Sequence, residues 1–165
     1  MKKIPLLISI IAIMAFSGGC QSDKNGANDS DITPNYADVQ VEMVAQAILA
    51  EVEIPSAAEK GTDDIEYFIG SLDTHSIKEL SYFICASGAY PDELLIIKFA
   101  DADAAAAARS GVESRLESRR DDFRDYAPAE MYKFDDAQVL INGEMLFFYI
   151  TSNNAKVREI IDSYM

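Results

Sequence analysis

The sequence contains only two cysteines, one histidine and no tryptophan among its 165 residues. Two cysteines cannot build a disulfide framework, and a single histidine without a cluster of cysteines or acids is a poor metal site. Motifs of the His-Glu-x-x-His, Cys-x-x-Cys and Gly-x-Ser-x-Gly types are missing, as is a glycine-rich phosphate loop. With no catalytic constellation to point to, we expect a non-enzymatic protein that needs no cofactor and no metal.

Basic residues are scarce compared with acidic ones. Lysine and arginine total 14 against 28 for aspartate and glutamate, so the formal net charge is −14. Nucleic-acid binding places Lys and Arg on phosphates, and electrostatic docking on anionic lipid needs the same basic excess. We therefore expect no nucleic-acid partner and no charge-driven membrane contact, while the acidic charge keeps the domain soluble.

The apolar run at residues 4–16 is shorter than the roughly 20 residues that a transmembrane helix requires. It follows Lys2 and Lys3 and precedes the small residues Ser-Gly-Gly. A basic start, an apolar segment and small residues before a cut site are typical of a secretory signal peptide. We therefore predict a signal peptide over residues 1–19.

Cys20 directly follows these small residues, and this makes the segment resemble the lipobox of bacterial lipoproteins. The resemblance implies that the Cys20 thiol carries a diacylglyceryl group and that the chain is cut before it. Ser17 stands where that pattern usually has an aliphatic residue. More than one acyl chain gives stable anchoring, so Cys20 is expected to hold the protein on the outer face of the cell membrane. Loss of Lys2 and Lys3 with the signal takes the charge from −14 to −16.

Residues 21–35 are small and polar, with Gly, Pro, Asn, Asp and Ser. Such a segment cannot bury enough apolar area to offset its ordering entropy. We predict that residues 20–35 form the lipidated cysteine with a flexible tether. Residues 36–165 are long enough for a single domain with a sizeable core.

The first part of this domain predicts mostly helix. Apolar residues spaced by three and four indicate an amphipathic helix over residues 37–51. Residues 53–64 contain proline, glycine and small polar residues and are expected to form a loop. The short apolar run at residues 65–69 fits either a helix or a strand.

A second helix is expected next, followed by a buried strand. Thr74 or Ser76 is a suitable N-cap for a helix through about Ser87, with Gly88 as its C-terminal cap. Residues 93–99 are nearly continuously apolar, which favours a strand buried on both faces.

A long helix is predicted from Asp101 and Asp103 to about Arg124, because aspartate favours the first turn through capping and the helix dipole. Tyr126 and Pro128 lie where it should end. Its inward face is expected to carry Ala105, Ala108, Val112, Leu116 and Phe123.

The last third predicts a hairpin and a final helix. Asn142-Gly143 separates the apolar runs at residues 139–141 and 145–150, and Asn-Gly suits a type I′ turn. Ser152 or Asn153 is then expected to start a helix. The order of elements implies an α+β domain, in which three or four mostly antiparallel strands pack under about four helices.

The long helix concentrates arginine in an otherwise acidic domain: Arg109, Arg115, Arg119, Arg120 and Arg124. Arginine binds carboxylate or phosphate in two-point fashion, so an anionic ligand site at Arg115 and Arg119 is one interpretation. Local ion pairs with neighbouring acids are the favoured one. For Arg115 we expect a structural bond to a buried carboxylate or carbonyl.

Other polar residues favour structural roles. Asp63-Asp64 and Asp101-x-Asp103 lack the further ligands of an EF-hand loop and are expected to cap helices. Cys85 lies in an apolar stretch and should act as a small buried hydrophobe. His75 is expected to face solvent or to cap a helix.

Residues 91–101 resemble a motif of small lipoproteins from Clostridia-type Gram-positive bacteria. A spaced series follows: Arg115, Phe123, Tyr126, Pro128 and Gly143. This succession is similar to the DUF4358 family, a domain of unknown function, over roughly residues 37–165. The chain departs from that pattern where the family often has glutamine soon after Arg115. The resemblance implies a lipoprotein address and no established reaction, so it transfers no catalytic residues.

These observations together predict a lipid-anchored extracytoplasmic protein that acts as a binding or interaction module at the cell surface. Its partner would be an envelope protein or a small ligand, in addition to the membrane reached through Cys20. A cell-envelope enzyme and an accessory subunit of a membrane complex are the alternatives.

Overall fold

The computed structural model describes residues 38–165, with Asp38 as the first. The predictions of a signal peptide, a lipidated Cys20 and a tether lie outside the described residues. No helix in the described part of the chain is both long enough and apolar enough to cross a membrane.

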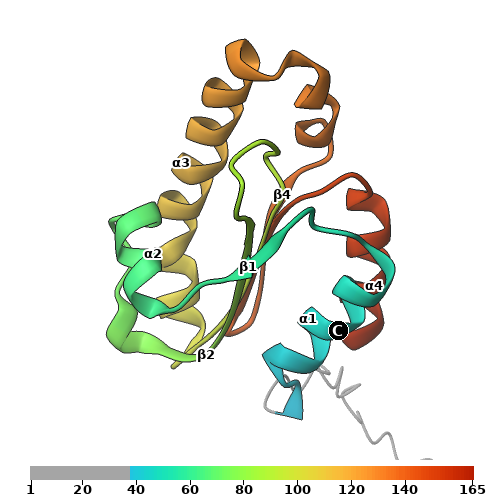
Figure 1. Cartoon of the computed structure of the whole chain (residues 1–165). Helices are drawn as coiled ribbons and strands as arrows, with labels where there is room; N and C mark the ends of the chain where they lie inside the picture. The colour runs from blue at the N-terminus through green and yellow to red at the C-terminus, as the bar shows by residue number, and fades with distance from the viewer. Residues whose placement is uncertain (1–37) are drawn as a thin grey trace, which may run out of the picture. The chain divides into compact units, whose positions relative to one another are not determined.

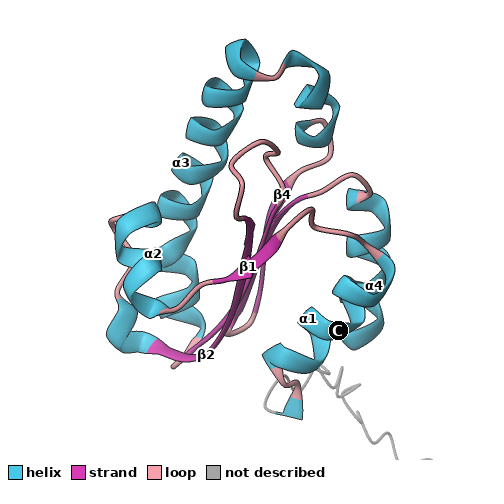
Figure 2. Cartoon of the chain, in the orientation of Figure 1, coloured by secondary structure: helices cyan, strands magenta, loops and turns pink. Residues whose placement is uncertain are grey.

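A five-stranded antiparallel sheet, in the order β1-β2-β3-β5-β4, forms the middle layer of the domain. Helices α2 and α3 cover one face and α1 and α4 cover the other (Figures 1 and 2). The α+β class is confirmed, but the sheet has five strands where three or four were expected. In chain order the elements are α1 (Val41–Glu51), β1 (Ala57–Glu59), α2 (Thr62–Ile69), η2 (Thr74–Ser76), β2 (Ile77–Cys85), β3 (Glu93–Phe99), α3 (Ala102–Tyr126), η3 (Pro128–Phe134), β4 (Gln138–Asn142), β5 (Met145–Ile150) and α4 (Asn154–Tyr164).

Strand β3 lies at the centre of the sheet, and all seven of its residues are buried. Successive side chains of a strand point to opposite faces. Leu95 and Ile97 therefore enter the core under α2 and α3, while Leu94 and Ile96 enter the core under α1 and α4. The prediction of a doubly buried strand at residues 93–99 is confirmed.

Helix α3 is the longest of the described helices and follows the sequence prediction closely. The Asp101 side chain caps it by accepting from the backbone N–H of Ala104 at 2.9 Å. The five residues expected on its inward face are all buried. A Cβ on Gly111 would lie 2.5 Å from the Ser71 hydroxyl, so this glycine permits a close approach to the chain after α2.

The helix predicted from Thr74 or Ser76 through Ser87 is wrong. A single 3-10 turn, η2, is followed by the nine-residue strand β2. Tyr82, Phe83 and Ile84 favour strands, and two antiparallel neighbours satisfy the backbone of β2. Gly88 has φ +66° in the turn between β2 and β3 and caps no helix.

Residues 53–64 form more than the predicted loop. The three-residue strand β1 pairs with β2, so that Ala57 lies opposite Cys85. Helix α2 begins at Thr62 and includes residues 65–69, which decides the segment that the sequence left open. The amphipathic helix predicted over residues 37–51 is present as α1.

The hairpin of β4 and β5 is confirmed, but its turn lies one residue later than predicted. Asn142 still pairs with Met145, so Gly143 and Glu144 form the two-residue turn. Gly143 has φ +56°, and Glu144 is not among the residues with positive φ. A positive φ at the first central residue alone indicates a type II′ turn in place of the expected type I′. Asn153 then caps α4, as predicted.

Candidate functional site

The arginines of α3 fall into three that pair with acids on the same helix and two whose side chains are largely buried. Arg109 pairs with Glu113, Arg120 with Glu117 and Arg124 with Asp121, as the local ion-pair interpretation expects. Arg115 and Arg119 instead have side chains only 13% and 15% exposed. These two were the candidate site residues of the sequence, and the structure brings them to one carboxylate.

That carboxylate is Glu93, whose side chain is fully buried at the start of β3. Arg115 donates to it in two-point fashion, from Nε to Oε1 and from a terminal nitrogen to Oε2, each at 3.1 Å. Nε of Arg119 lies 3.3 Å from Oε2. The bond to a buried carboxylate that a structural Arg115 requires is therefore present.

Two neighbours complete this Glu93 cluster. The Tyr82 hydroxyl on β2 donates to Oε1 of Glu93 at 2.7 Å. The guanidinium of Arg115 lies over the Phe68 ring at 4.8 Å, and that of Arg119 lies over Phe123 at 4.7 Å. Arginine is suited to such stacking because its guanidinium is planar and weakly hydrated.

Burial and neighbouring charges shift the pKa values of the side chains in the cluster. Burial, together with the charge and hydrogen bond of Glu93, raises the pKa of Tyr82 far above its ordinary value. Burial lowers the pKa of Arg115, but Glu93 more than compensates, and the net pKa is raised. Burial also lowers the pKa of Arg119, with repulsion from Arg115 adding to the effect. Tyr82 therefore stays a neutral donor and Arg115 stays a cation.

A second buried ion pair lies next to the first in sequence. Lys133 of η3 donates to Oδ2 of the fully buried Asp92 at 2.5 Å and pairs with Glu130 at 2.8 Å. Burial raises the pKa of Asp92, opposed by its bond to Lys133. The adjacent acids Asp92 and Glu93 thus hold η3 and α3 respectively to the start of β3.

Three exposed tyrosines lie near the Glu93 cluster and the Asp92–Lys133 pair. Tyr90, Tyr126 and Tyr132 are 39%, 69% and 55% exposed, and we call them the tyrosine surface. The ammonium of Lys133 lies 5.1 Å from the Tyr90 ring centre and 6.0 Å from that of Tyr132. The Tyr126 ring packs edge-to-face on Phe123.

Tyr126 is the last residue of α3 and Tyr132 lies on η3, whereas Tyr90 lies in the turn between β2 and β3. The C-terminal end of α3 and η3 lie at the opposite end of the domain from the start of α1 (Figure 1). Lys133 lies near the rings of Tyr90 and Tyr132, and the Tyr126 ring packs on Phe123, over which Arg119 lies. A backbone carbonyl of Tyr90 accepts from Arg119 at 3.3 Å, which fixes the turn that carries the first tyrosine. Aromatic residues on so rigid a support are suited to contact a partner.

The remaining candidates of the sequence take structural places. Asp101 and Asp64 accept backbone N–H groups at helix starts, and no group of three or more metal-ligating side chains occurs among residues 38–165. His75 is exposed on η2, where its ring lies 3.5 Å from Asp73. Cys85 is buried. Burial raises the pKa of its thiol, but hydrogen bonds from Ser87 and the nearby backbone bring the net pKa below its ordinary value.

One family model matches the part of the chain that carries this framework. The model of a domain of unknown function, DUF4358, matches residues 50–151. The chain belongs to the DUF4358 family. The DUF4358 match includes Glu93, both buried arginines and the Asp92–Lys133 pair, whereas most of α1 and all of α4 lie outside it. No curated protein and no solved structure matches the chain.

Sequence reasoning missed the two buried acids of this site. A usable signal was present in β3, because Glu93 shares its face with Leu95 and Ile97. A charge on a strand buried on both faces needs a partner. Lys133 carried no such signal, since its segment reads as an irregular connection.

Proposed function

We propose that this protein is a lipid-anchored extracytoplasmic interaction module whose tyrosine surface binds a protein partner. The exposed tyrosines on a buried, ion-paired support are the observation that carries the proposal. Tyrosine and arginine dominate the energetically important positions of protein interfaces, because they supply rigid contact area together with a polar group. The lipoprotein-like start of the sequence, with Cys20, supports the location on the outer face of the cell membrane.

Charge defines the chemistry of the partner. Asp121, Asp122 and Asp125 are exposed beside the tyrosine surface, and the whole chain is strongly acidic. A partner with a basic surface would be attracted to this end of the domain and would place cations on the tyrosine rings. We therefore expect a protein partner rich in lysine or arginine at its contact site.

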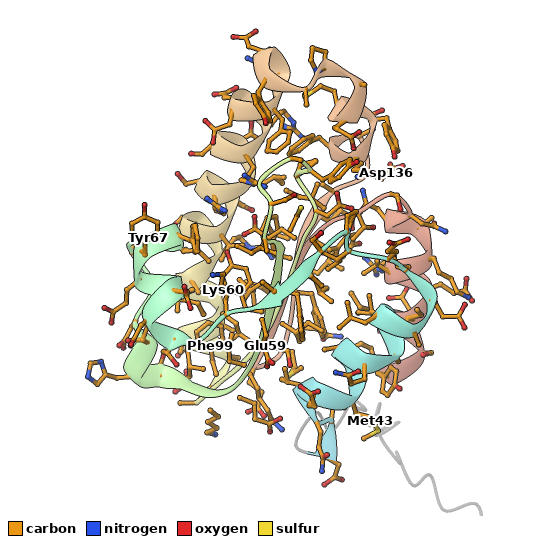
Figure 3. All side chains as sticks on the ribbon, in the orientation of Figure 1. Met43, Glu59, Lys60, Tyr67, Phe99 and Asp136 are labelled. Carbon is orange, nitrogen blue, oxygen red and sulfur yellow. The ribbon has the colours of Figure 1, made fainter. Side chains whose placement is uncertain are left out.

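Site-specific crosslinking tests the proposed surface. A photoreactive amino acid at Tyr126 or Tyr132 in the full-length chain should give one defined adduct in intact cells. The matched control is Tyr67, which is 83% exposed on α2 and points away from the domain (Figure 3). Equal adducts from all three positions would show that the tyrosine surface is not special. Identifying the crosslinked protein by peptide mass spectrometry separates a soluble envelope protein from a membrane-complex subunit, which the accessory-subunit alternative requires.

The anchor is tested separately. Cys20→Ser should abolish incorporation of a fatty-acid analogue, because the thiol that would carry the diacylglyceryl group is gone. Cys85→Ser is the matched control and should leave the label unchanged. Equal labelling of the wild type and Cys20→Ser would refute the lipid anchor without affecting the proposed tyrosine surface.

A further inference from the structure

The buried hydroxyl of Tyr149 has no hydrogen-bond partner among the described residues. Tyr149 is 0% exposed on β5, where it lies opposite Gln138 of the edge strand β4. Leaving a buried polar group unpaired is costly, and native proteins contain few such groups. The hydroxyl therefore points to a contact that the domain alone does not supply.

Tyr149 is one of the residues that line a pocket of about 310 Å³. This pocket is formed between the start of β4 and the first turns of α4, and its volume is at the lower end of the range for small-molecule sites. Asp136, on its rim, lies close to the start of α4 in Figure 3. The lining residues are Asp136, Gln138, Tyr149, Asn154, Ala155 and Arg158.

Charged residues near this pocket act on the Tyr149 hydroxyl. Burial raises the pKa of Tyr149 to about 12, Arg158 opposes that rise, and Asp162 and Asp136 add to it. Two of these three charged residues line the pocket. The hydroxyl thus remains protonated at neutral pH and is a donor for a bound molecule.

One polar residue of the lining already makes hydrogen bonds within the domain. The Asn154 amide donates to the Lys133 carbonyl at 2.7 Å and accepts from the backbone and hydroxyl of Thr151 at 2.8 and 2.9 Å. These bonds fix Asn154 as a rigid wall of the pocket. Recognition is left to the Tyr149 hydroxyl, Arg158, Asp136 and Gln138.

The two charged residues of the lining have opposite signs. Arg158 donates from Nε to Asp162 at 2.8 Å, which orients the guanidinium while leaving its two terminal amino groups for a ligand. Asp136 is an exposed carboxylate on the other element of the pocket. A simple anion would meet Arg158 but be repelled by Asp136, whereas a molecule with both charges satisfies the two residues.

We propose that this pocket binds a small zwitterion of the α-amino-acid class. Arg158 and the Tyr149 hydroxyl receive its carboxylate, and Asp136 receives its ammonium group. The Gln138 amide is placed to contact the side chain of the ligand. This site is distinct from the tyrosine surface, so it stands or falls independently of the proposed protein interaction.

The test measures the melting temperature of the full-length chain in detergent with each of the twenty common amino acids at about 10 mM, since a ligand that binds the folded state stabilises it. At least one amino acid should raise the melting temperature, while acetate and methylammonium, which carry one charge each, should not. If no amino acid produces a shift, or if acetate produces an equal one, the proposal is overturned.

Variants locate the binding. Tyr149→Phe should weaken the affinity about fivefold to tenfold and Arg158→Gln by tenfold or more, as measured by calorimetry. The matched control is Arg109→Gln, because Arg109 forms the same i,i+4 ion pair on α3 with nearly the same exposure, 45% against 47%. Ligand-free Tyr149→Phe should melt no lower than the wild type, so lost affinity cannot be ascribed to unfolding. Unchanged affinity in both pocket variants would place the site elsewhere and refute the assignment.

Discussion

Tyr82 and Tyr149 are two fully buried tyrosines on opposite faces of the same sheet, and their hydroxyls meet opposite fates. The hydroxyl of Tyr82 lies 2.7 Å from Glu93 inside a cluster that also receives two arginines. The hydroxyl of Tyr149 has no partner in the described part of the chain, and Tyr149 is one of the residues that line a pocket. The tyrosine hydroxyl on the α3 face is therefore satisfied within the domain, whereas the one on the α4 face is not.

This difference separates residues that hold the fold from residues available to a ligand. Evolution tolerates an unpaired buried hydroxyl at a cost in stability, and such costs concentrate at functional sites. Arg115 and Arg119, the candidate site residues of the sequence, belong to the Glu93 cluster. The comparison directs a search for small ligands to α4, away from the Arg-rich helix.

The largest effect on stability should come from removing the charge at the centre of the Glu93 cluster. Glu93→Gln leaves Arg115 and Arg119 buried without a carboxylate, and we expect a loss of about 3–5 kcal/mol in the free energy of unfolding in urea. Glu117→Gln removes an exposed partner of Arg120 and should cost less than about 0.5 kcal/mol. Similar losses in the two variants would contradict the structural role of the Glu93 cluster.

Removing one arginine should have a smaller effect, because the other remains beside Glu93. Arg115→Ala should lower the free energy of unfolding by roughly 1.5–3 kcal/mol, since it breaks a two-point bond to a charged group. Arg119→Ala should cost less, because its Nε makes no hydrogen bond of good geometry with Glu93. An unchanged thermal melt of Arg115→Ala would instead support the interpretation of this residue as a ligand-binding group.

The two tyrosines give the most direct contrast. Tyr82→Phe should cost roughly 1.5–3 kcal/mol, because it removes a hydrogen bond to a carboxylate. Tyr149→Phe removes a hydroxyl that has no partner and should be neutral or stabilising by up to about 1 kcal/mol. Both free energies come from urea unfolding at neutral pH. A comparable loss in Tyr149→Phe would show that its hydroxyl is satisfied in solution.

Alkaline pH should destabilise the wild type more than Tyr149→Phe, by a smaller amount than the substitutions above. The pKa of Tyr149 is raised to about 12 in the folded state, against about 10 in the unfolded chain. The stability that Tyr149 contributes as a neutral group is full below pH 10 and is lost as the pH rises toward 12. We expect a loss of about 1 kcal/mol near pH 11 that is absent in Tyr149→Phe. An identical pH dependence in both proteins would contradict the burial of this hydroxyl.

Much of the fold was accessible from local sequence signals. The Asp101 cap and the apolar face indicated α3, the uninterrupted apolar run indicated β3, and the glycine of the turn indicated the last hairpin. Strand β2 could not be predicted from local signals, because Thr74, Ser76 and Gly88 are residues that also suit the two ends of a helix. Its strand state depends on pairing with β1 and β3, and tertiary context overrides a local cap.

The site was less predictable than the fold. Arg115 was correctly singled out, but its partner Glu93 lies 22 residues earlier, and only the register of β3 against α3 brings them together. The Tyr149 pocket depends on Gln138, Asp136 and the first turns of α4, which meet through the hairpin. Nothing in the composition of these segments distinguishes Tyr149 from the other core aromatics.

Lys133 connects the two regions. Its ammonium is bound to Asp92, while its backbone carbonyl accepts from Asn154 at the wall of the pocket. Opening η3 would break both bonds together, so the amide protons of η3 and of the first turn of α4 should exchange with solvent as one cooperative unit. A molecule bound in the pocket would then slow amide hydrogen exchange as far away as the turn before Asp92. The peptide that contains Lys133 would show this binding.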